Sequence, residues 1–325
     1  MTSVLVTGAG GLIGTAVAEA ARQAGYDVTR VLRKATGEAD VLERDLRRPL
    51  KDVPPCDWVF HLAGGYAGAG KCALRRADLK IARNLARWGR DNSVKNWVVA
   101  SAAEVYGCID GLGSEEAPTR PVIPYGAVKL AVEKLFRHAA KPDGRLVLLR
   151  IGEVYGPKAR LIRELTGRLK RGRCPWPGSG RVPVSFVHVE DVAGAFLCAA
   201  ERAPEGIAIY NVADDAPTTW RAFVCRIAEL QDCRPPIFVP RWLARAYAMV
   251  DEFASLMAGR PPVLTGHALS LLTTPKALSN RRIVAELGFR PRYPNWRAGL
   301  EATLHGLSHD AQDGRAQSGA ARASA

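Results

Sequence analysis

The stretch TGAGGLIG, residues 7–14, decides the fold of this chain. It follows the apolar run SVLVT (3–7), whose length and β-branched residues predict a strand. It continues into residues 12–24, where apolar side chains recur at helical spacing. A strand, a glycine-rich turn and a helix in immediate succession are typical of the first unit of a dinucleotide-binding fold.

Each glycine of this turn has its own purpose. Gly8 permits the tight turn after the strand, Gly11 lets a pyrophosphate approach the backbone, and Gly14 lets the helix pack closely on the sheet. The phosphates would then lie on free N–H groups at the positive end of the helix dipole. We therefore predict that these glycines bind the cofactor, together with Leu12 and Ile13.

Strand and helix patterns continue to alternate through the first half of the chain. This alternation predicts an α/β fold, in which a doubly wound parallel sheet of the Rossmann type carries helices on both faces. The further predicted strands are DVTRVLR (27–33), DWVFHLA (57–63), NWVVAS (96–101) and RLVLLRIG (145–152).

The alternation breaks after residue 156, which indicates how the chain is divided. We predict an NAD(P)-binding Rossmann domain at 1–156, with 184–213 returning to its sheet. A smaller, interleaved C-terminal substrate-binding region is expected at 157–183 and 214–308, where proline and glycine interrupt the pattern. Residues 309–325 are small and polar, so we expect a disordered tail there.

The end of the second predicted strand bears on the choice between NADP and NAD. A carboxylate there would bind the ribose hydroxyls and repel a 2′-phosphate, but this chain has Arg33 and Lys34. Arginine presents a fork of donors that suits a phosphate, so the sequence favours NADP over NAD. Further along, Asp45 and Leu46 are candidates for the adenine pocket, although Asp45 can equally cap a turn.

Tyr125 and Lys129, within PYGAVKLAVEKLF (124–136), form the candidate catalytic pair. They are one turn apart on a predicted helix, so they lie on one face. An ammonium close to a phenol favours the phenolate, and we expect Lys129 to lower the pKa of Tyr125 from about 10. A tyrosine with a lowered pKa can act as acid or base toward a hydroxyl or carbonyl group.

Several motifs support a resemblance that covers most of the chain. They are TGAGGLIG (7–14), FHLAGG (60–65), NWVVASAAEVYG (96–107), PYGAVK (124–129), LRIGEVYGP (149–157), FVHVEDVAGAF (186–196), IYNVADDAPTT (209–219) and ELGFRPRY (286–293). Together they resemble the extended short-chain dehydrogenase/reductase family of NAD-dependent epimerases, dehydratases and reductases. The resemblance implies a bound nicotinamide cofactor, with Tyr125 as acid/base, Lys129 binding the ribose, and Leu62, Ala63 and Gly64 lining the cofactor. It also implies a homodimer, because helices beside the sheet often pair in this family.

The chain departs from the family at Ala102, where serine or threonine usually hydrogen-bonds the reacting oxygen. Ser101 is the neighbouring candidate for that catalytic role. Adjacent side chains on a strand face opposite ways, so Ser101 could serve only if the strand end twists or bulges. Loss of one such donor costs roughly 2–4 kcal/mol of transition-state stabilisation. The alternative to an active enzyme is therefore a cofactor-binding sensor or subunit with weak or no catalysis.

Three further residues bear on the substrate. Glu104 stands where family dehydratases and decarboxylases have a catalytic glutamate, and its other interpretation is a polar residue ending a buried strand. Nucleotide-sugar members often have asparagine in place of Glu153 and arginine in place of Val184, and both serve the diphosphate. The C-terminal pattern is loosely similar to the branch of hydroxysteroid dehydrogenases and dihydroflavonol-type reductases. Two substrate classes stay open for hydride transfer at a carbinol or carbonyl carbon: a sugar nucleotide, or a ring alcohol or ketone.

Composition sets the remaining limits. The 325 residues have a net charge of +14 and seven dispersed cysteines, which indicates reduced thiols in the cytoplasm and no metal site. No apolar run approaches the roughly 18 residues of a membrane helix, and no nucleic-acid motif accompanies the charge. The basic stretch 158–173 has one apolar stripe, which we interpret as a solvated helix; an anionic substrate or a peripheral membrane contact is the alternative. We expect a small-molecule substrate as the main partner.

Overall fold

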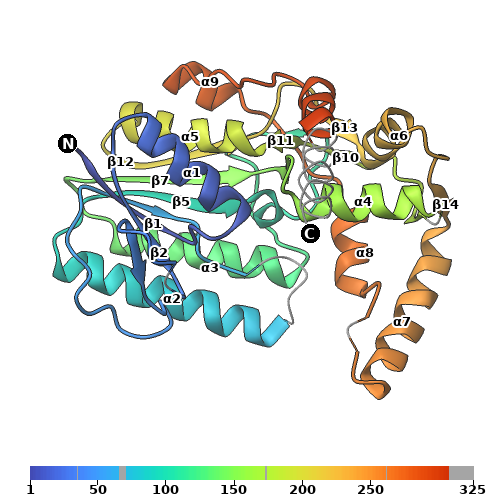
Figure 1. Ribbon diagram of the computed structural model, residues 1–325, viewed down its shortest axis with the longest axis horizontal. Helices are drawn as coiled ribbons and strands as arrows, with labels where there is room; N and C mark the ends of the chain where they lie inside the picture. The colour runs from blue at the N-terminus through green and yellow to red at the C-terminus, as the bar shows by residue number, and fades with distance from the viewer. Residues whose placement is uncertain (35, 66–70, 173, 261, 307–325) are drawn as a thin grey trace, which may run out of the picture.

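A parallel β-sheet forms the centre of the molecule (Figure 1). The computed structural model describes residues 1–34, 36–65, 71–172, 174–260 and 262–306. The tail expected at 309–325 lies outside these residues. Within them the sheet has seven strands in the order β12-β7-β5-β4-β1-β2-β3. These strands are β1 (Ser3–Thr7), β2 (Asp27–Leu32), β3 (Val41–Glu43), β4 (Trp58–His61), β5 (Asn96–Ala102), β7 (Arg145–Ile151) and β12 (Gly206–Val212).

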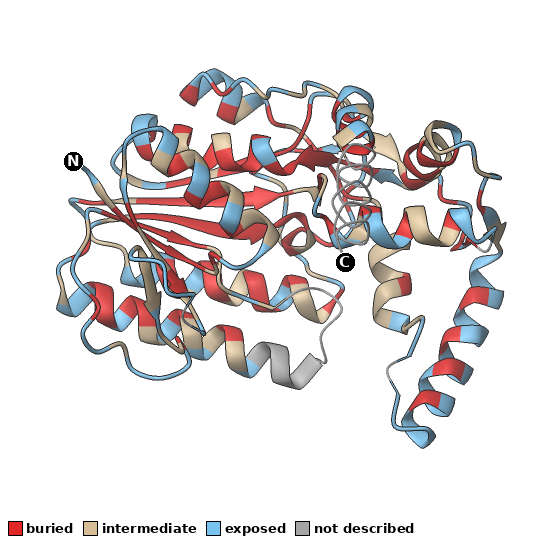
Figure 2. Ribbon diagram, in the orientation of Figure 1, coloured by how far each residue is buried: buried red, intermediate tan, exposed pale blue. Residues whose placement is uncertain are grey.

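Helices cover both faces of this sheet, which confirms the predicted doubly wound α/β fold (Figure 1). On one face lie α1 (Leu12–Gln23), α5 (Val189–Arg202) and α9 (Arg281–Leu287). On the other lie α2 (Lys71–Asp91) and α3 (Pro124–Ala139). Successive strand side chains alternate between two cores, as Val4 packs on the α1 side and Leu5 on the α2 side. Figure 2 shows the strands buried between these layers.

The order of the strands places the site. β1 lies between β2 and β4, so the chain crosses to opposite sides of β1 in its two halves. Ligands of open parallel sheets bind at such a switch point, outside the carboxyl ends of the strands. The glycine turn at 7–14 follows β1 and therefore lies at this position.

Residues 184–213 return to the main sheet only in part, through β12. β11 (Phe186–His188) pairs instead with β8 (Glu153–Tyr155), and β10 (Pro183–Val184) pairs with β13 (Thr218–Thr219). The two segments come close at Gly152, where an added Cβ would be 2.6 Å from the carbonyl oxygen of Ser185. A glycine directly after β7 therefore leaves room for β8 and β11 to pair.

The smaller part has its own core, built on α4 (Arg160–Lys170) and α6 (Trp220–Leu230). The ring of Phe186 stacks on that of Phe223 at 3.9 Å between centroids. The prediction for 158–173 is confirmed, because Ile162, Leu165 and Leu169 form one buried stripe on α4. Two more pairs of short strands join distant segments: β6 (Leu112–Gly113) with β15 (Ala277–Leu278), and β9 (Pro175–Pro177) with β14 (Ile237–Val239). α7 (Arg241–Met257) and α8 (Gly266–Thr273) pack on each other and extend away from the body (Figure 1).

Asp214, just after β12, makes stability dependent on pH. Its side chain is buried, and burial raises the pKa of its carboxyl from 3.8 to about 8. A carboxyl whose pKa rises on folding stabilises the native state at low pH, and that contribution is lost as pH rises through the folded pKa. We expect the free energy of unfolding to fall by on the order of 1 kcal/mol per pH unit as the pH rises from the ordinary pKa of 3.8 to the folded value of about 8. Denaturant titrations at several pH values should show a flatter profile for Asp214→Asn, and an unchanged slope would contradict the assignment.

Candidate active site

The glycine turn forms a cradle that side chains would fill. Gly8 has φ +73°, and an added Cβ there would lie 2.6 Å from the backbone nitrogen of Ala63. An added Cβ on Gly14 would lie 2.2 Å from the carbonyl oxygen of Gly8. No side chain caps α1 at Gly11, and its first turn contains no acidic residue. The N–H of Gly11 donates within the turn to the carbonyl of Gly8 at 2.9 Å, whereas the first N–H groups of α1, which begins at Leu12, have no partner in the helix and no side-chain cap. The start of α1 at the switch point therefore fits the phosphates of a dinucleotide.

Hydrogen bonds of the Thr7 side chain hold the loop after β4 against this glycine turn. Its hydroxyl lies 2.8 Å from Nδ1 of His61 and accepts from the backbone N–H groups of Leu62, at 3.3 Å, and Ala63, at 3.4 Å. Burial first, and then the charge of Lys129, lowers the pKa of His61 to about 3. His61 is thus a neutral, hydrogen-bonded core residue, and Leu62 and Ala63 lie against the glycine turn.

Arg33 and Lys34 are exposed directly after β2. β2 ends beside the cradle, because an added Cβ on Gly10 would lie 3.3 Å from Cδ2 of Leu32. The two basic side chains therefore follow the strand at the edge of the dinucleotide cradle, where the adenine ribose of a bound cofactor belongs.

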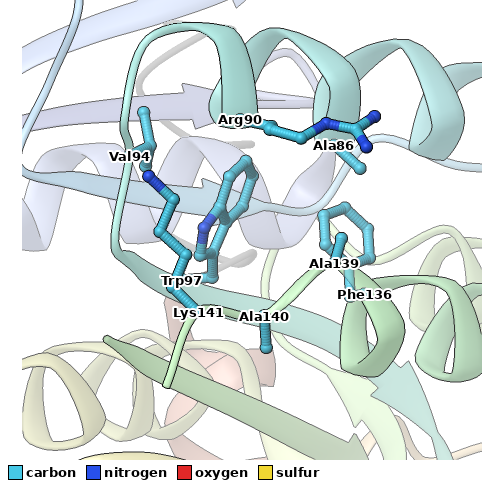
Figure 3. Close-up of a pocket in the computed structure, with 8 residues that line it drawn as sticks. All are labelled: Ala86, Arg90, Val94, Trp97, Phe136, Ala139, Ala140 and Lys141. Atoms are coloured by element: carbon cyan, nitrogen blue, oxygen red, sulfur yellow. The ribbon is translucent and has the colours of Figure 1, made fainter. Parts of the chain in front are cut away.

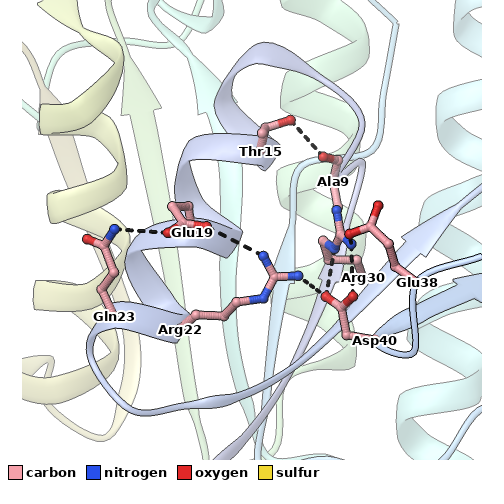
Figure 4. Close-up of polar contacts among 8 residues, drawn as sticks. All are labelled: Ala9, Thr15, Glu19, Arg22, Gln23, Arg30, Glu38 and Asp40. Carbon is pink, nitrogen blue, oxygen red and sulfur yellow. Dashed lines mark hydrogen bonds and ion pairs between the residues drawn. The ribbon is translucent and has the colours of Figure 1, made fainter. Parts of the chain in front are cut away.

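A network of charged side chains braces β2 against the helix that follows the cradle (Figure 4). Nε of Arg30 donates to Asp40 at 2.7 Å, and its Nη2 donates to the same carboxylate at 2.8 Å. Glu38 also contacts Arg30, and Arg22 of α1 contacts Asp40. Arg30 is therefore engaged in structural ion pairs, whereas Arg33 and Lys34 are exposed.

Asp45 caps a turn in this structure. Its carboxylate accepts from the backbone N–H of Arg47 at 3.0 Å and from Nε of Arg47 at 2.9 Å. These hydrogen bonds, the side-chain one first, lower the pKa of Asp45 to about 2. The side chain of Leu46 is buried in the core, and its carbonyl accepts from Asn84 at 2.9 Å. Of the two interpretations of Asp45, the observed contacts are those of the turn.

Tyr125 and Lys129 lie on one face of α3, as their spacing predicts. The ammonium of Lys129 is 5.8 Å from the centroid of the Tyr125 ring and donates to the carbonyl of Ala100 at 3.3 Å. α3 begins tightly against the turn η1 (Ala103–Val105), because an added Cβ on Gly126 would lie 2.1 Å from the carbonyl oxygen of Glu104. This glycine lets the tyrosine approach the end of β5.

We predicted that Lys129 lowers the pKa of Tyr125. For the side chains that surround the tyrosine in this protein, that prediction is wrong. Burial first, and then the negative charges of Glu104, Asp78 and Glu153, raises the pKa of this phenol above its ordinary value. Burial lowers the pKa of Lys129, although nearby carboxylates oppose that change. Burial and the carboxylates together keep the pKa of Tyr125 high, so the phenol holds its proton at neutral pH.

Asp78 of α2 is a site residue that the sequence analysis missed. Its buried carboxylate accepts from the backbone N–H of Gly65 at 2.8 Å. An added Cβ on Gly64 would lie 3.1 Å from Asp78 Oδ2 and 3.4 Å from Lys129 Nζ, so both groups reach the cofactor loop. Burial raises the pKa of Asp78. Its signal in the sequence was a carboxylate at helical spacing with the buried Ala82 and Leu85.

The structure corrects the catalytic assignment of Ser101. Its hydroxyl donates to Glu133, which forms a buried ion pair with Arg150 at 2.8 Å. Ala102 ends β5 in an extended conformation, so neighbouring side chains alternate and Ser101 faces this ion pair. The strand does not bulge, and Ser101 is engaged in the core.

A buried lysine joins the two glutamates that the sequence analysis had considered separately. Nζ of Lys276 donates to Glu104 at 2.5 Å and also contacts Glu153. Lys276 is only 2% exposed, and a β-bridge joins it to Val184, whose side chain is buried. Burial alone would lower the pKa of Lys276, but the two carboxylates raise it above its ordinary value. The Glu104–Lys276–Glu153 cluster therefore has two carboxylates against one ammonium.

The cluster borders a hollow beside the N-terminus of α3. Glu104, Ile123 and Lys276 line this hollow, with Ser270 and Leu271 of α8. Another hollow lies at the opposite edge of the sheet, where β5 begins (Figure 3). It is lined by Ala86, Arg90, Val94, Trp97, Phe136, Ala139, Ala140 and Lys141. Since cofactor loops follow the carboxyl ends of the strands, only the first hollow belongs to the candidate site.

Comparison with known proteins agrees with this geometry. Residues 4–213 match the model of the NAD dependent epimerase/dehydratase family. The chain belongs to this family. It is thus an enzyme of the extended short-chain dehydrogenase/reductase type that uses a nicotinamide cofactor, as its motifs indicated. Among the described residues, none of the helices has the length and apolar content needed to cross a membrane.

Two curated relatives span nearly the full length of the chain. The 3-diazoavenalumate denitrifying reductase of a Streptomyces species is 28% identical, and the alignment covers 91% of this chain and 98% of that protein. The 4-hydroxy-2-methyl-3-oxo-4-farnesyl-3,4-dihydroquinoline-1-oxide ketoreductase of Stigmatella aurantiaca is also 28% identical, with 91% and 94% covered. Among solved structures, MoeE5 in complex with UDP-glucuronic acid and NAD is 27% identical, with a TM-score of 0.75 over 95% of this chain and 99% of that one.

Proposed function

We propose that this enzyme reduces a carbonyl group on an apolar ring compound, with NADPH as the preferred cofactor. The observation that supports this most is the Glu104–Lys276–Glu153 cluster. The single ammonium of Lys276 is paired with two carboxylates, so the cluster presents a net negative charge to a ligand. A diphosphate placed against it would be repelled, whereas a neutral ring compound would not.

The charge state of Tyr125 supports reduction. Burial and carboxylates keep its phenol protonated, which is the form that donates a proton to a carbonyl oxygen. The bound nicotinamide supplies the hydride to the carbonyl carbon. Lys129 lies where it can hold the cofactor ribose, close to Gly64 and Asp78. We assign Glu104 to the charged cluster and to positioning of the substrate, because its carboxylate is held by Lys276.

The comparisons support the same class. Both curated relatives that span the chain are named as reductases. The alternative is a sugar-nucleotide epimerase, and it is favoured by the likeness to MoeE5, whose structure holds UDP-glucuronic acid. In the family, asparagine and arginine serve the diphosphate at the positions of Glu153 and Val184. Here the first is a carboxylate bound to Lys276 and the second is a buried apolar side chain.

A panel of cyclic ketones and sugar nucleotides tests the proposal directly. NADPH carrying deuterium at the transferred position should label a ring alcohol at the former carbonyl carbon, and mass spectrometry detects the label. Turnover of a sugar nucleotide, with no activity on any ketone, would replace this function with the alternative.

We expect Arg33→Asp to weaken NADPH binding roughly 10–100-fold and to leave NADH binding nearly unchanged. A charged hydrogen bond contributes about 1.5–3 kcal/mol, and the new carboxylate would also repel the 2′-phosphate. Arg137→Asp on the exposed surface of α3 is the control with the same charge change. Fluorescence titration of each variant with both cofactors measures the effect, and equal losses for both would contradict the NADP preference.

We also infer a homodimer, because members of this family often associate through helices beside the sheet. Arg76, Lys80, Arg83 and Arg87 form an exposed basic stripe on α2. The exposed side chains of α3 include Lys134 and Arg137, so a two-fold axis on either helix would oppose like charges. Sedimentation velocity of the cofactor-loaded protein distinguishes dimer from monomer.

A further inference from the structure

α7 (Arg241–Met257) has its large apolar side chains on the outside. On its inner side the helix packs through the small residues Ala244, Ala248 and Ser255, and α8 lies against it. A surface helix ordinarily buries its large apolar residues, so the arrangement is reversed. The side chains that we call the apolar face of α7 are Trp242, Tyr247, Met249, Phe253, Leu256 and Met257.

The apolar face is large for a soluble protein. Trp242 is 73% exposed, Tyr247 51% and Phe253 68%. These three rings alone expose roughly 300–480 Å², which matches the largest apolar patch of a typical monomer. Leu256 and Met257 add to it, at 79% and 73% exposed. The largest apolar patch of a monomer is often functional, so this face is a candidate interaction surface.

The position of the face suits a flat partner. α7 and α8 project from the body, and α7 lies at the outer edge of the molecule (Figure 1). In Figure 2 the outward side of α7 is largely exposed along its length. A planar surface can therefore reach the face without meeting the rest of the protein.

The charges of α7 favour an anionic partner. Arg241 and Arg245 are exposed beside the apolar face. Of the acidic side chains of the helix, Asp251 is buried and accepts from the backbone N–H of Leu264 at 3.0 Å, whereas Glu252 is exposed and accepts from that of Gly266 at 2.9 Å. The exposed charges of α7 are thus two arginines and one glutamate, and the whole chain carries +14.

We propose that the apolar face of α7 docks on the surface of an anionic lipid bilayer. Interfacial helices combine a wide apolar face rich in Trp, Phe and Leu with basic residues at its border, as α7 does. Tyrosine and tryptophan rings also favour the headgroup level of a bilayer. α8, which packs on α7, lines the hollow beside Glu104 and Lys276. An apolar substrate dissolved in the bilayer would therefore meet the protein close to the site. Docking itself does not depend on the proposed substrate class.

Co-sedimentation of the full-length, cofactor-loaded protein with vesicles tests this proposal. The vesicles are phosphatidylcholine alone and phosphatidylcholine with phosphatidylglycerol. We expect binding to the mixed vesicles, and a loss of about tenfold or more in partitioning for Phe253→Glu and for Leu256→Glu. Val284→Glu on α9 also places a glutamate at an exposed apolar position, where Val284 is 39% exposed, and should bind as the wild type does.

Two outcomes would overturn the proposal. Equal binding of the wild type and both α7 variants would mean that the overall positive charge holds the protein on the vesicles. Absence of vesicle binding, with a dimer in sedimentation velocity that Phe253→Glu dissociates, would make the face a contact between two copies of this chain. Cofactor affinity measured on the same samples confirms that each variant is folded. If the enzyme reduced no ring ketone, the vesicle result would still stand.

Discussion

Tyr125→Phe is expected to lower kcat by about 10²–10⁴-fold while the affinity for NADPH stays within about twofold. The substitution removes only the hydroxyl that donates the proton, and the ring keeps its packing at the start of α3. Stopped-flow measurement of NADPH oxidation gives the rate, and fluorescence titration gives the affinity. We expect a large loss because Tyr125 has no second hydroxyl to share its role. Ala102 carries no hydroxyl, and that of Ser101 is bound to Glu133.

The same variant separates an enzyme from a cofactor-binding sensor. In a sensor, Tyr125→Phe would leave the already weak turnover unchanged, and that result would contradict the proposed reduction. Ala102→Ser is the complementary variant, since it restores the hydroxyl that most of the family has. It should raise kcat in the wild-type background and do little when Tyr125 is phenylalanine, because the two hydroxyls act on one oxygen.

Lys276→Met should lower the free energy of unfolding by about 3–5 kcal/mol at neutral pH. The ammonium is buried between Glu104 and Glu153, so its removal leaves two carboxylates facing each other without compensation. Burial already raises the pKa of Glu153, and the destabilisation should therefore shrink in acid as these carboxyls become protonated. Denaturant unfolding at neutral and acidic pH measures the difference.

A charge-matched control distinguishes this cause from poor packing. Lys276→Met combined with Glu104→Gln and Glu153→Gln removes the whole cluster, and it should recover more than half of the lost stability. If the triple variant were as unstable as Lys276→Met alone, the loss would come from the lysine's packing, and the cluster would not carry the electrostatic role assigned to it.

The sequence was sufficient for the fold because its signals are local. The glycines at 8, 11 and 14 act within one turn, and the strand patterns at 27–33 and 145–152 each act within one segment. Tyr125 and Lys129 share a face by helical spacing alone. Each of these predictions needed only neighbours along the chain.

The electrostatic environment of the site could not be predicted from local sequence patterns. Lys276 meets Glu104 across 172 positions of sequence, through the pairing of β15 with β6. The pKa of Tyr125 is raised first by burial and then by three carboxylates from α2, η1 and β8, and the lysine one turn away does not decide it. Ser101 could be judged only when its partner Glu133 was seen. Contacts between segments that are far apart in the sequence bring these groups together, and no local sequence pattern predicts such contacts.

One measurement tests the central claim most directly: a thermal-shift titration of the NADPH-loaded protein with UDP, GDP, dTDP and CDP. A ligand that binds only the folded state adds about 2.7 kcal/mol of stability at a hundred times its Kd, which raises the Tm clearly. Our account predicts no shift with any of the four, because the Glu104–Lys276–Glu153 cluster repels a diphosphate. A selective shift with one nucleotide would contradict it, and would identify that nucleotide's sugar as the substrate.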